Sequence, residues 1–288
     1  GSGAISNAVA MGTATAASVA GGLVGYMGGG SISNVYALGN GFGTSGLVGN
    51  AGGTSTATNA YYNADTNANG ALGANGANVT VGALTTAQLQ GALPSGFSSS
   101  VWGTGSGLYP YLKTFYPNGL QAISGAAATG GAAAALAQVT LYSGGARFDA
   151  AYTGDNGAYY IIAAPGTIAS STALGALLTL NGGSVASGLS YANSRTLSNG
   201  DVAGFDIGSG QIAASTSATT FSGLQSLLGA TFGTSNLSSA LAAITNPDYK
   251  ITASGAFMLD ADLTGGGAVS IKSGGDLTID NPVTVGGA

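Results

Sequence analysis

Gly-Gly-Leu-Val-Gly at residues 21–25 returns as Ser-Gly-Leu-Val-Gly at residues 45–49, so the two leucines lie 24 positions apart. Neighbouring sequence recurs as well, because Ile-Ser-Asn-Ala-Val-Ala-Met-Gly at 5–12 matches Ile-Ser-Asn-Val-Tyr-Ala-Leu-Gly at 32–39. A fainter third copy is Thr-Asn-Ala-Tyr-Tyr at 58–62. Glycine-rich repeats of roughly 20 to 30 residues with short apolar runs are typical of solenoids. The repeats therefore predict a stack of similar coils.

The repeat length favours one coil per repeat over residues 1–83. We expect an all-β fold, a right-handed parallel β-helix (β-solenoid), in which successive coils stack about 4.8 Å apart. The glycine pairs permit tight corners at positive φ. Leu23, Val24, Leu47 and Val48 are expected to fill equivalent interior positions in neighbouring coils.

Three asparagines recur at equivalent positions of the three copies, namely Asn7, Asn34 and Asn59. In a solenoid, equivalent asparagine side chains can hydrogen-bond along the stack as a ladder. Asparagine also suits a turn for its own backbone reasons, without any ladder. Both interpretations predict that the three residues lie at the same corner of successive coils.

The composition excludes several functional classes. The chain has 53 glycines, 45% hydrophobic residues and only 5% charged residues, which argues against ordinary disorder. A net charge of −5 with five scattered Lys and Arg residues argues against a nucleic-acid partner. Without histidine or cysteine, imidazole- and thiol-based catalytic or zinc sites cannot be assembled, so no cofactor or metal is expected. No apolar stretch is long enough for a transmembrane helix, so no membrane insertion is expected.

The repeat pattern ends at Leu84. Thr85 and Gln88 have the spacing of a capping box, which predicts a short helix over Thr86–Leu93. The following stretch holds the only tryptophan, Trp102, and several tyrosines and phenylalanines.

This aromatic segment, residues 84–121, has two interpretations. Large rings can close the open end of a solenoid or seal a junction. Alternatively, Trp102, Tyr109 and Tyr111 form an aromatic platform that faces a sugar ligand. The first interpretation is the more economical, because apolar rings are most often buried.

Residues 122–247 lack the repeat and form a predicted insert with strands and a helical hairpin. The segment 122–137 is rich in Ala and Gly and is expected to be a linker or an interrupted helix. Apolar spacing predicts a helix after Thr220 and a second one from Ser235 or Asn236, which stops at Asn246-Pro247. The strand candidates are Gln138–Tyr142 and Tyr159–Ile162, while Ala173–Leu180 fits either a strand or a helix.

Alternating apolar runs resume in residues 248–288, where Phe257 and Leu277 lie 20 positions apart. This spacing predicts tighter β-helix coils. If one coil takes 20 residues, Asp260 and Asp280 lie on neighbouring coils, and Asp262 lies close by. Paired carboxylates can hydrolyse glycosides, but such residues can equally be solvated and keep a fibre soluble. No catalytic residue is therefore assigned.

The segment Asp65–Gly70 begins like a calcium-binding loop. Its twelfth position is Gly76, where a carboxylate should stand, so turn chemistry explains the segment more simply.

Two groups of motifs resemble known bacterial surface proteins. The repeated Gly-Leu-Val-Gly, followed by Leu-Thr-Thr at 84–86, Val-Trp at 101–102 and Tyr-Pro-Tyr-Leu at 109–112, resembles the GLUG repeat and the segment that ends its array. The resemblance covers roughly residues 4–117. Gly-Gly-Asp-Leu-Thr-Ile at 274–279 is similar to haemagglutinin-type repeats of filamentous exoproteins exported by two-partner secretion.

The resemblance implies an internal fragment of a Gram-negative adhesin that is secreted or held at the cell surface. We therefore expect a non-enzymatic structural segment that mediates attachment, biofilm formation or cell–cell contact. Its expected partners are a carbohydrate or host-surface receptor, or further copies of itself. The alternatives are a carbohydrate-active β-helix enzyme that uses Asp residues and a self-assembling extracellular fibre subunit.

Overall fold

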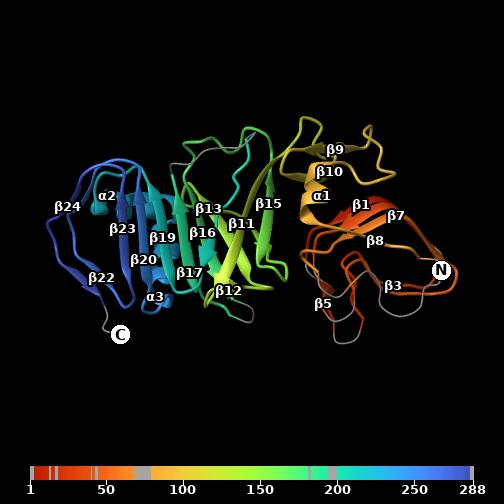
Figure 1. Cartoon of the computed structure of the whole chain (residues 1–288), viewed down its shortest axis with the longest axis horizontal. Helices are drawn as coiled ribbons and strands as arrows, with labels where there is room; N and C mark the ends of the chain where they lie inside the picture. The colour runs from red at the N-terminus through yellow and green to blue at the C-terminus, as the bar shows by residue number, and fades with distance from the viewer. Residues whose placement is uncertain are drawn as a thin grey trace. The chain divides into compact units, whose positions relative to one another are not determined.

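The computed structural model describes residues 3–12, 14–16, 19–39, 41–42, 45–67, 70, 79–180, 183–193 and 200–285 (Figure 1). Strands hold 48% of the residues and helices 11%, so the fold is mostly β, in agreement with the all-β expectation. The chain divides into two compact units. The first consists of Gly1–Ala122, Gly154–Ala158 and Ile162–Pro165, and the second of Ile123–Thr153, Tyr159–Ile161 and Gly166–Ala288.

The regular elements are numbered in chain order, and Figure 1 labels most of them. Up to residue 120 they are β1 (Gly3–Ala10), β2 (Ala14–Thr15), β3 (Val24–Met27), β4 (Gly30–Ala37), β5 (Gly41–Phe42), β6 (Val48–Ala51), β7 (Ser55–Asn63), β8 (Gly82–Leu84), α1 (Thr86–Gly91), β9 (Trp102–Gly105) and β10 (Leu108–Leu112). Beyond it they are β11 (Gln121–Thr129), β12 (Ala132–Ala133), β13 (Gln138–Ser143), β14 (Ala146–Tyr152), β15 (Ala158–Ala163), β16 (Leu174–Thr179), β17 (Gly188–Ala192), β18 (Ile207–Gly208), β19 (Gln211–Thr216), α2 (Phe221–Phe232), α3 (Thr234–Ala243), β20 (Asp248–Ala253), β21 (Phe257–Leu259), β22 (Leu263–Gly265), β23 (Val269–Ser273), β24 (Leu277–Ile279) and β25 (Val283–Val285).

Strands that lie one repeat apart pair in parallel in the first unit. β1 pairs with β4 and β4 with β7, so that Ile5, Ile32 and Ala57 lie side by side. β2 pairs with β5, and β3 pairs with β6, where Val24 lies beside Val48. Equivalent residues of successive repeats therefore become neighbours in space, as the sequence repeats predict.

The apolar repeat residues form the core of this unit. Leu47 and Val48 are fully buried, whereas Leu23 and Val24 pack against the core and are partly buried. The pair Gly29-Gly30 has the predicted positive φ, at 154 and 96°. The pair Gly21-Gly22 has a different role, because neither residue has a positive φ. A Cβ atom on Gly22 would lie 2.2 Å from the carbonyl oxygen of Gly46. Glycine is needed there because backbones of successive repeats approach closely.

The second unit is organised around a mixed seven-stranded sheet with the order β14-β13-β16-β17-β19-β20-β23. β14, β13, β16 and β17 pair antiparallel, whereas β17, β19, β20 and β23 pair in parallel. The sheet runs continuously from the predicted insert (122–247) into the predicted coils (248–288). Most of the first segment and all of the second therefore belong to one compact unit.

Three parallel pairs repeat at an interval of 20 residues near the end of this unit. Tyr249 in β20 pairs with Val269 in β23. Phe257 in β21 pairs with Leu277 in β24. The third pair joins Leu263 in β22 to Val283 in β25. The spacing predicted from the sequence is confirmed for these strands.

The two predicted helices lie between β19 and β20, which are nevertheless direct neighbours in the sheet. Thr220 begins α2, and its side chain accepts a hydrogen bond from the amide of Gly223. The apolar face of α2 belongs to the main core cluster together with residues of β17, β19 and β20. Its buried apolar residues are Phe221, Leu224, Leu228 and Phe232. The helices are therefore part of the core.

Several expected boundaries differ from the structure. The segment 122–137 contains strands β11 and β12 and is neither a linker nor a helix. α1 ends at Gly91, two residues before the predicted end, and α3 ends at Ala243. The capping box is confirmed, because Thr85 and Gln88 exchange side-chain and backbone hydrogen bonds.

Candidate functional site

The part of the aromatic segment that follows α1 packs against β4 and β7, on the face of these strands opposite to the core. Tyr36 in β4 lies beside Tyr61 in β7, and the ring of Phe97 contacts both, with centroid distances of 6.3 and 5.9 Å. Trp102 stacks on Phe97 at 4.6 Å. The tyrosine hydroxyl groups bind the same segment, since Tyr61 donates to the carbonyl oxygen of Ser95 at 3.0 Å. These rings fasten the segment to the sheet.

Two of the three aromatic residues predicted to face a ligand are buried. Trp102 is 1% exposed, and its Nε1 donates a hydrogen bond to Oδ1 of Asn7 at 3.3 Å. The Tyr109 hydroxyl accepts a hydrogen bond from Asn63 and donates one to Thr86. Burial raises the pKa of Tyr109, so this phenol stays protonated. Neither ring presents a face to a sugar, and both stabilise the packing of the segment.

The three repeat asparagines share one backbone conformation. Asn7, Asn34 and Asn59 have φ values of 50, 51 and 52°, in the left-handed region. Nδ2 of Asn59 donates a hydrogen bond to Oδ1 of Asn34 at 2.9 Å, which forms one rung of the expected ladder. Asn7 instead accepts from Trp102. The shared left-handed conformation agrees with the turn interpretation, and the bond between Asn59 and Asn34 agrees with the ladder interpretation.

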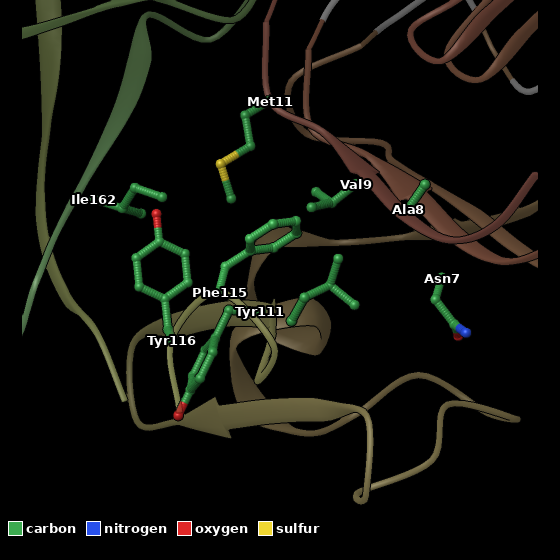
Figure 2. Close-up of a pocket in the computed structure, with 9 residues that line it drawn as sticks. Asn7, Ala8, Val9, Met11, Tyr111, Phe115, Tyr116 and Ile162 are labelled. Atoms are coloured by element: carbon green, nitrogen blue, oxygen red, sulfur yellow. The ribbon is translucent and has the colours of Figure 1, made fainter. Parts of the chain in front are cut away.

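The third predicted aromatic residue, Tyr111, lines a pocket of about 710 Å³ in the first unit. We call it the aromatic pocket (Figure 2). It is lined by Asn7, Ala8, Val9, Met11, Tyr111, Leu112, Phe115, Tyr116 and Ile162.

The β9–β10 hairpin sets the orientation of Tyr111. Tyr111 pairs with Gly103 on the neighbouring strand. A Cβ atom on Gly103 would lie 2.3 Å from the Tyr111 ring, so the ring can cross β9 only because this residue is glycine. The ring also meets Tyr116 edge-on, with centroids 6.3 Å apart and an interplanar angle of 88°. The two rings therefore form a corner with a fixed geometry.

A turn after β10 positions the other two rings. The backbone amides of Phe115 and Tyr116 both donate to the carbonyl oxygen of Leu112 at 3.1 Å. Figure 2 shows the Phe115 ring in the middle of the pocket, next to Val9. The Phe115 side chain is 72% exposed, the highest value among the exposed large apolar residues of the described part of the chain.

The chemistry that the aromatic pocket offers is apolar and neutral. Among the described residues that line it, none carries a charge. Polar groups come from the phenol hydroxyls of Tyr111 and Tyr116 and from the amide of Asn7. Pockets of roughly 300–1,000 Å³ with apolar walls and a few polar groups are typical of small-ligand sites.

The paired-carboxylate hypothesis fits the structure poorly. Leu259 and Ile279 pair in register, which places Asp260 and Asp280 directly after two neighbouring strands. Asp260, however, binds the first turn of α2, because it accepts hydrogen bonds from both the amide and the hydroxyl of Ser222. Hydrogen bonds from Ser222 lower the pKa of Asp260. A carboxylate held ionised in this way is a helix cap, and it is unsuited to act as a general acid.

Asp65, the first residue of the calcium-like segment, has a similar structural role. Its Oδ2 accepts a hydrogen bond from the backbone amide of Thr86 at 2.8 Å, at the start of α1. Residues 68 and 69 of the segment lie outside the described residues. In the described part of the chain, no group of three or more acidic, histidine or cysteine side chains is arranged to hold a metal.

No helix within the described ranges has the length and hydropathy needed to cross a membrane. Comparison with known proteins gave no match: no family model, curated protein or solved structure resembles the chain significantly. Function must therefore be inferred from the fold and the aromatic pocket.

Proposed function

We propose that the chain is a β-solenoid segment of a secreted or cell-surface adhesin, with a structural role in attachment. The observation that carries this proposal is the parallel, in-register pairing of strands one repeat apart. It occurs in β1, β4 and β7 with offsets of 27 and 25 residues (Gly3 to Gly30 to Ser55), and between β20 and β23 with an offset of 20 (Tyr249 to Val269). Such stacks extend by adding coils and present long, regular faces.

The surface chemistry supports a role in display. Only 5% of the residues are charged, and glycine, serine, threonine and asparagine are abundant. Faces of this kind offer hydroxyl and amide groups without a strong electrostatic field. In the proposed architecture, a right-handed parallel β-helix, these faces project outward while the repeated apolar residues fill the interior. The resemblance to GLUG-repeat and filamentous haemagglutinin-like exoproteins of Gram-negative bacteria supports the same proposal.

The attachment role can be tested directly with coated beads. Beads that carry the purified chain should remain on epithelial monolayers under flow in larger numbers than beads coated with serum albumin. Beads coated with the urea-denatured chain control for non-specific stickiness. Equal retention of folded and denatured chains would contradict the proposed role, because it would show that the folded surface does not matter.

A second candidate, self-assembly into fibres, is favoured by the exposed side chains of the last described strands. β24 and β25 leave four large apolar residues 38–57% exposed: Leu277, Ile279, Val283 and Val285. Parallel addition of a strand from another copy would cover them. Sedimentation velocity at rising concentration tests this candidate. Growth that Ile279→Lys abolishes supports assembly, and a constant sedimentation coefficient rejects it.

A further inference from the structure

The aromatic pocket contains a combination of groups that the packing of the first unit does not explain. Phe115 is largely exposed, although burying a large ring from water is favourable. Its backbone is held by a hydrogen bond to Leu112, so the ring sits on a defined turn. Next to it, Tyr111 and Tyr116 form an edge-on pair. Three rings from one short segment thus line one cavity with an exposed apolar wall.

We propose that this pocket binds a neutral sugar residue of a glycan, an inference that rests on the proposed attachment function and names its ligand. One face of a pyranose ring consists of C–H groups whose hydrogens carry a partial positive charge. These groups pack favourably on the electron-rich face of an aromatic ring. The exposed ring of Phe115 provides such a face.

Hydroxyl groups of the sugar find partners at the polar groups of the same pocket. Tyr111 and Tyr116 each provide a phenol group that can donate and accept. Asn7 contributes an amide side chain, whose Oδ1 already accepts a hydrogen bond from the indole of Trp102. Stacking and hydrogen bonding are thus both possible for one bound sugar.

The absence of charge from the described lining residues decides between classes of glycan. Placing a carboxylate or sulfate group in a pocket without a counter-charge has a large desolvation cost. Acidic sugars are therefore disfavoured. The volume of about 710 Å³ suits a small ligand of the size of one to two sugar rings.

A glycan array provides the test. The full chain, fluorescently labelled, is applied to an array that carries neutral and acidic glycans, together with an immobilised polyproline peptide. We expect binding to neutral glycans. Phe115→Ala should weaken it by about tenfold through loss of stacking, while Tyr152→Ala, which removes a 54% exposed ring in the second unit, should leave it unchanged. Because Phe115 is exposed, its replacement should not prevent folding.

Fluorescence provides an independent readout of occupancy. Trp102 is the only tryptophan and is hydrogen-bonded to Asn7 in the pocket wall. Titration with the best neutral glycan should shift its emission in the parent chain and in Tyr152→Ala, but not at the same concentrations in Phe115→Ala.

Three outcomes would overturn the inference: no neutral glycan is bound, only acidic glycans or polyproline are bound, or Phe115→Ala binds as well as the parent. The bead experiment separates this inference from the proposed function. If no neutral glycan is bound but beads still attach, the pocket proposal fails and the attachment role stands. If glycans bind but beads do not attach, the attachment role fails and the pocket stands.

Discussion

At the residue scale, the repeat depends on asparagine at a corner that other residues tolerate poorly. A left-handed backbone costs a residue with a Cβ atom about 1–2 kcal/mol, and asparagine is among the few residues that adopt it readily. Asn34 combines this conformation, at a φ of 51°, with a hydrogen bond from Asn59. Asn34 therefore adopts the backbone conformation that the corner of its own repeat requires, and its side chain links that repeat to the next.

Asn34→Ala should lower the free energy of unfolding of the first unit by about 2 kcal/mol, from backbone strain and the lost hydrogen bond. Asn34→Gly removes the hydrogen bond without the strain, so its effect should be about 1 kcal/mol smaller. Urea denaturation followed by Trp102 fluorescence measures both. Equal effects of the two substitutions would show that the backbone conformation is unimportant.

Asp260 makes the second unit sensitive to acid. Hydrogen bonds from Ser222 place the pKa of Asp260 below its ordinary value of 3.8. A carboxylate with a lowered pKa stabilises the fold above its unfolded pKa, and this contribution is lost as the pH falls through the folded pKa. Asp260→Asn should therefore be less stable than the parent at pH 5, and the difference should be smaller at pH 2.

Denaturation followed by far-UV circular dichroism at several pH values measures this difference. Ser222→Ala removes the donor hydroxyl but keeps the backbone amide, so it should reproduce part of the effect. A difference between parent and Asp260→Asn that is the same at both pH values would rule out the proposed ionised cap.

At the element scale, α2 fills part of the interior of the second unit, between β19 and β20 in the chain. The chain leaves β19, pairs briefly through Thr220 beside Met258, and then enters the helix. The buried face of α2 contacts the core cluster that includes Phe257 and Leu263 of the following coil. β21 and β22 pair with later strands, β24 and β25, and no earlier strand among the described residues pairs with them. The helix therefore covers the apolar side chains at the start of the 20-residue stack.

Leu224→Ala should lower the free energy of unfolding by about 2–5 kcal/mol, because Leu224 is 1% exposed and its removal leaves a cavity under the coils. Leu241→Ala on α3 is the matched control: it is 39% exposed and should cost less than about 1 kcal/mol. Guanidinium denaturation followed by circular dichroism measures both variants. Similar effects would mean that the hairpin is a surface attachment only.

At the scale of the whole molecule, the parallel pairing of successive strands predicts that the fold is modular. The last described strands pair with partners 20 positions earlier, and each stack leaves an edge with exposed apolar residues such as Leu277 and Ile279. In a solenoid, stability is approximately a sum of contributions from repeats and from the interfaces between neighbouring repeats. A further matching coil should therefore add stability.

Insertion of a second copy of residues 266–285 directly after Val285 tests this modularity. The duplicated chain should gain strand content and unfold at a higher denaturant concentration, because the new coil covers the apolar side chains of β24 and β25. The control insert carries serine in place of the four apolar residues of those strands. Hydrogen exchange would contradict the proposed solenoid if the inserted coil exchanged as rapidly as an unfolded peptide.

The sequence predicts the repeat-dependent parts of the fold well. The offsets between the sequence copies equal the offsets between paired residues in the parallel strands. Capping residues also located the starts of two helices, because Thr85 is the N-cap of α1 and Thr220 is the N-cap of α2. β11 escaped prediction because its Ala- and Gly-rich sequence has no apolar period. Besides the adjacent β12, it pairs with distant segments, as Ser124 shows by its hydrogen bonds with Val202 and Phe205.

The candidate site was predictable only in part. The aromatic stretch was evident, and Tyr111 was selected, but no local signal distinguishes it from the buried Trp102. The difference arises because Trp102 meets Asn7, 95 positions away, and the ring of Tyr36 on β4. Phe115 and Tyr116 were not selected as ligand-facing, since their exposure depends on the turn that follows Leu112.

The order of pairing in the 20-residue stack has a consequence for biogenesis. β23, β24 and β25 each pair with the strand one coil earlier, and α2 precedes them all. In a chain that emerges from a ribosome or a narrow pore with its amino terminus first, the earlier strand with which each of these strands pairs has therefore already emerged. Folding can proceed vectorially, one coil after another. Each completed coil then opposes backward movement of the chain and biases its passage in a single direction.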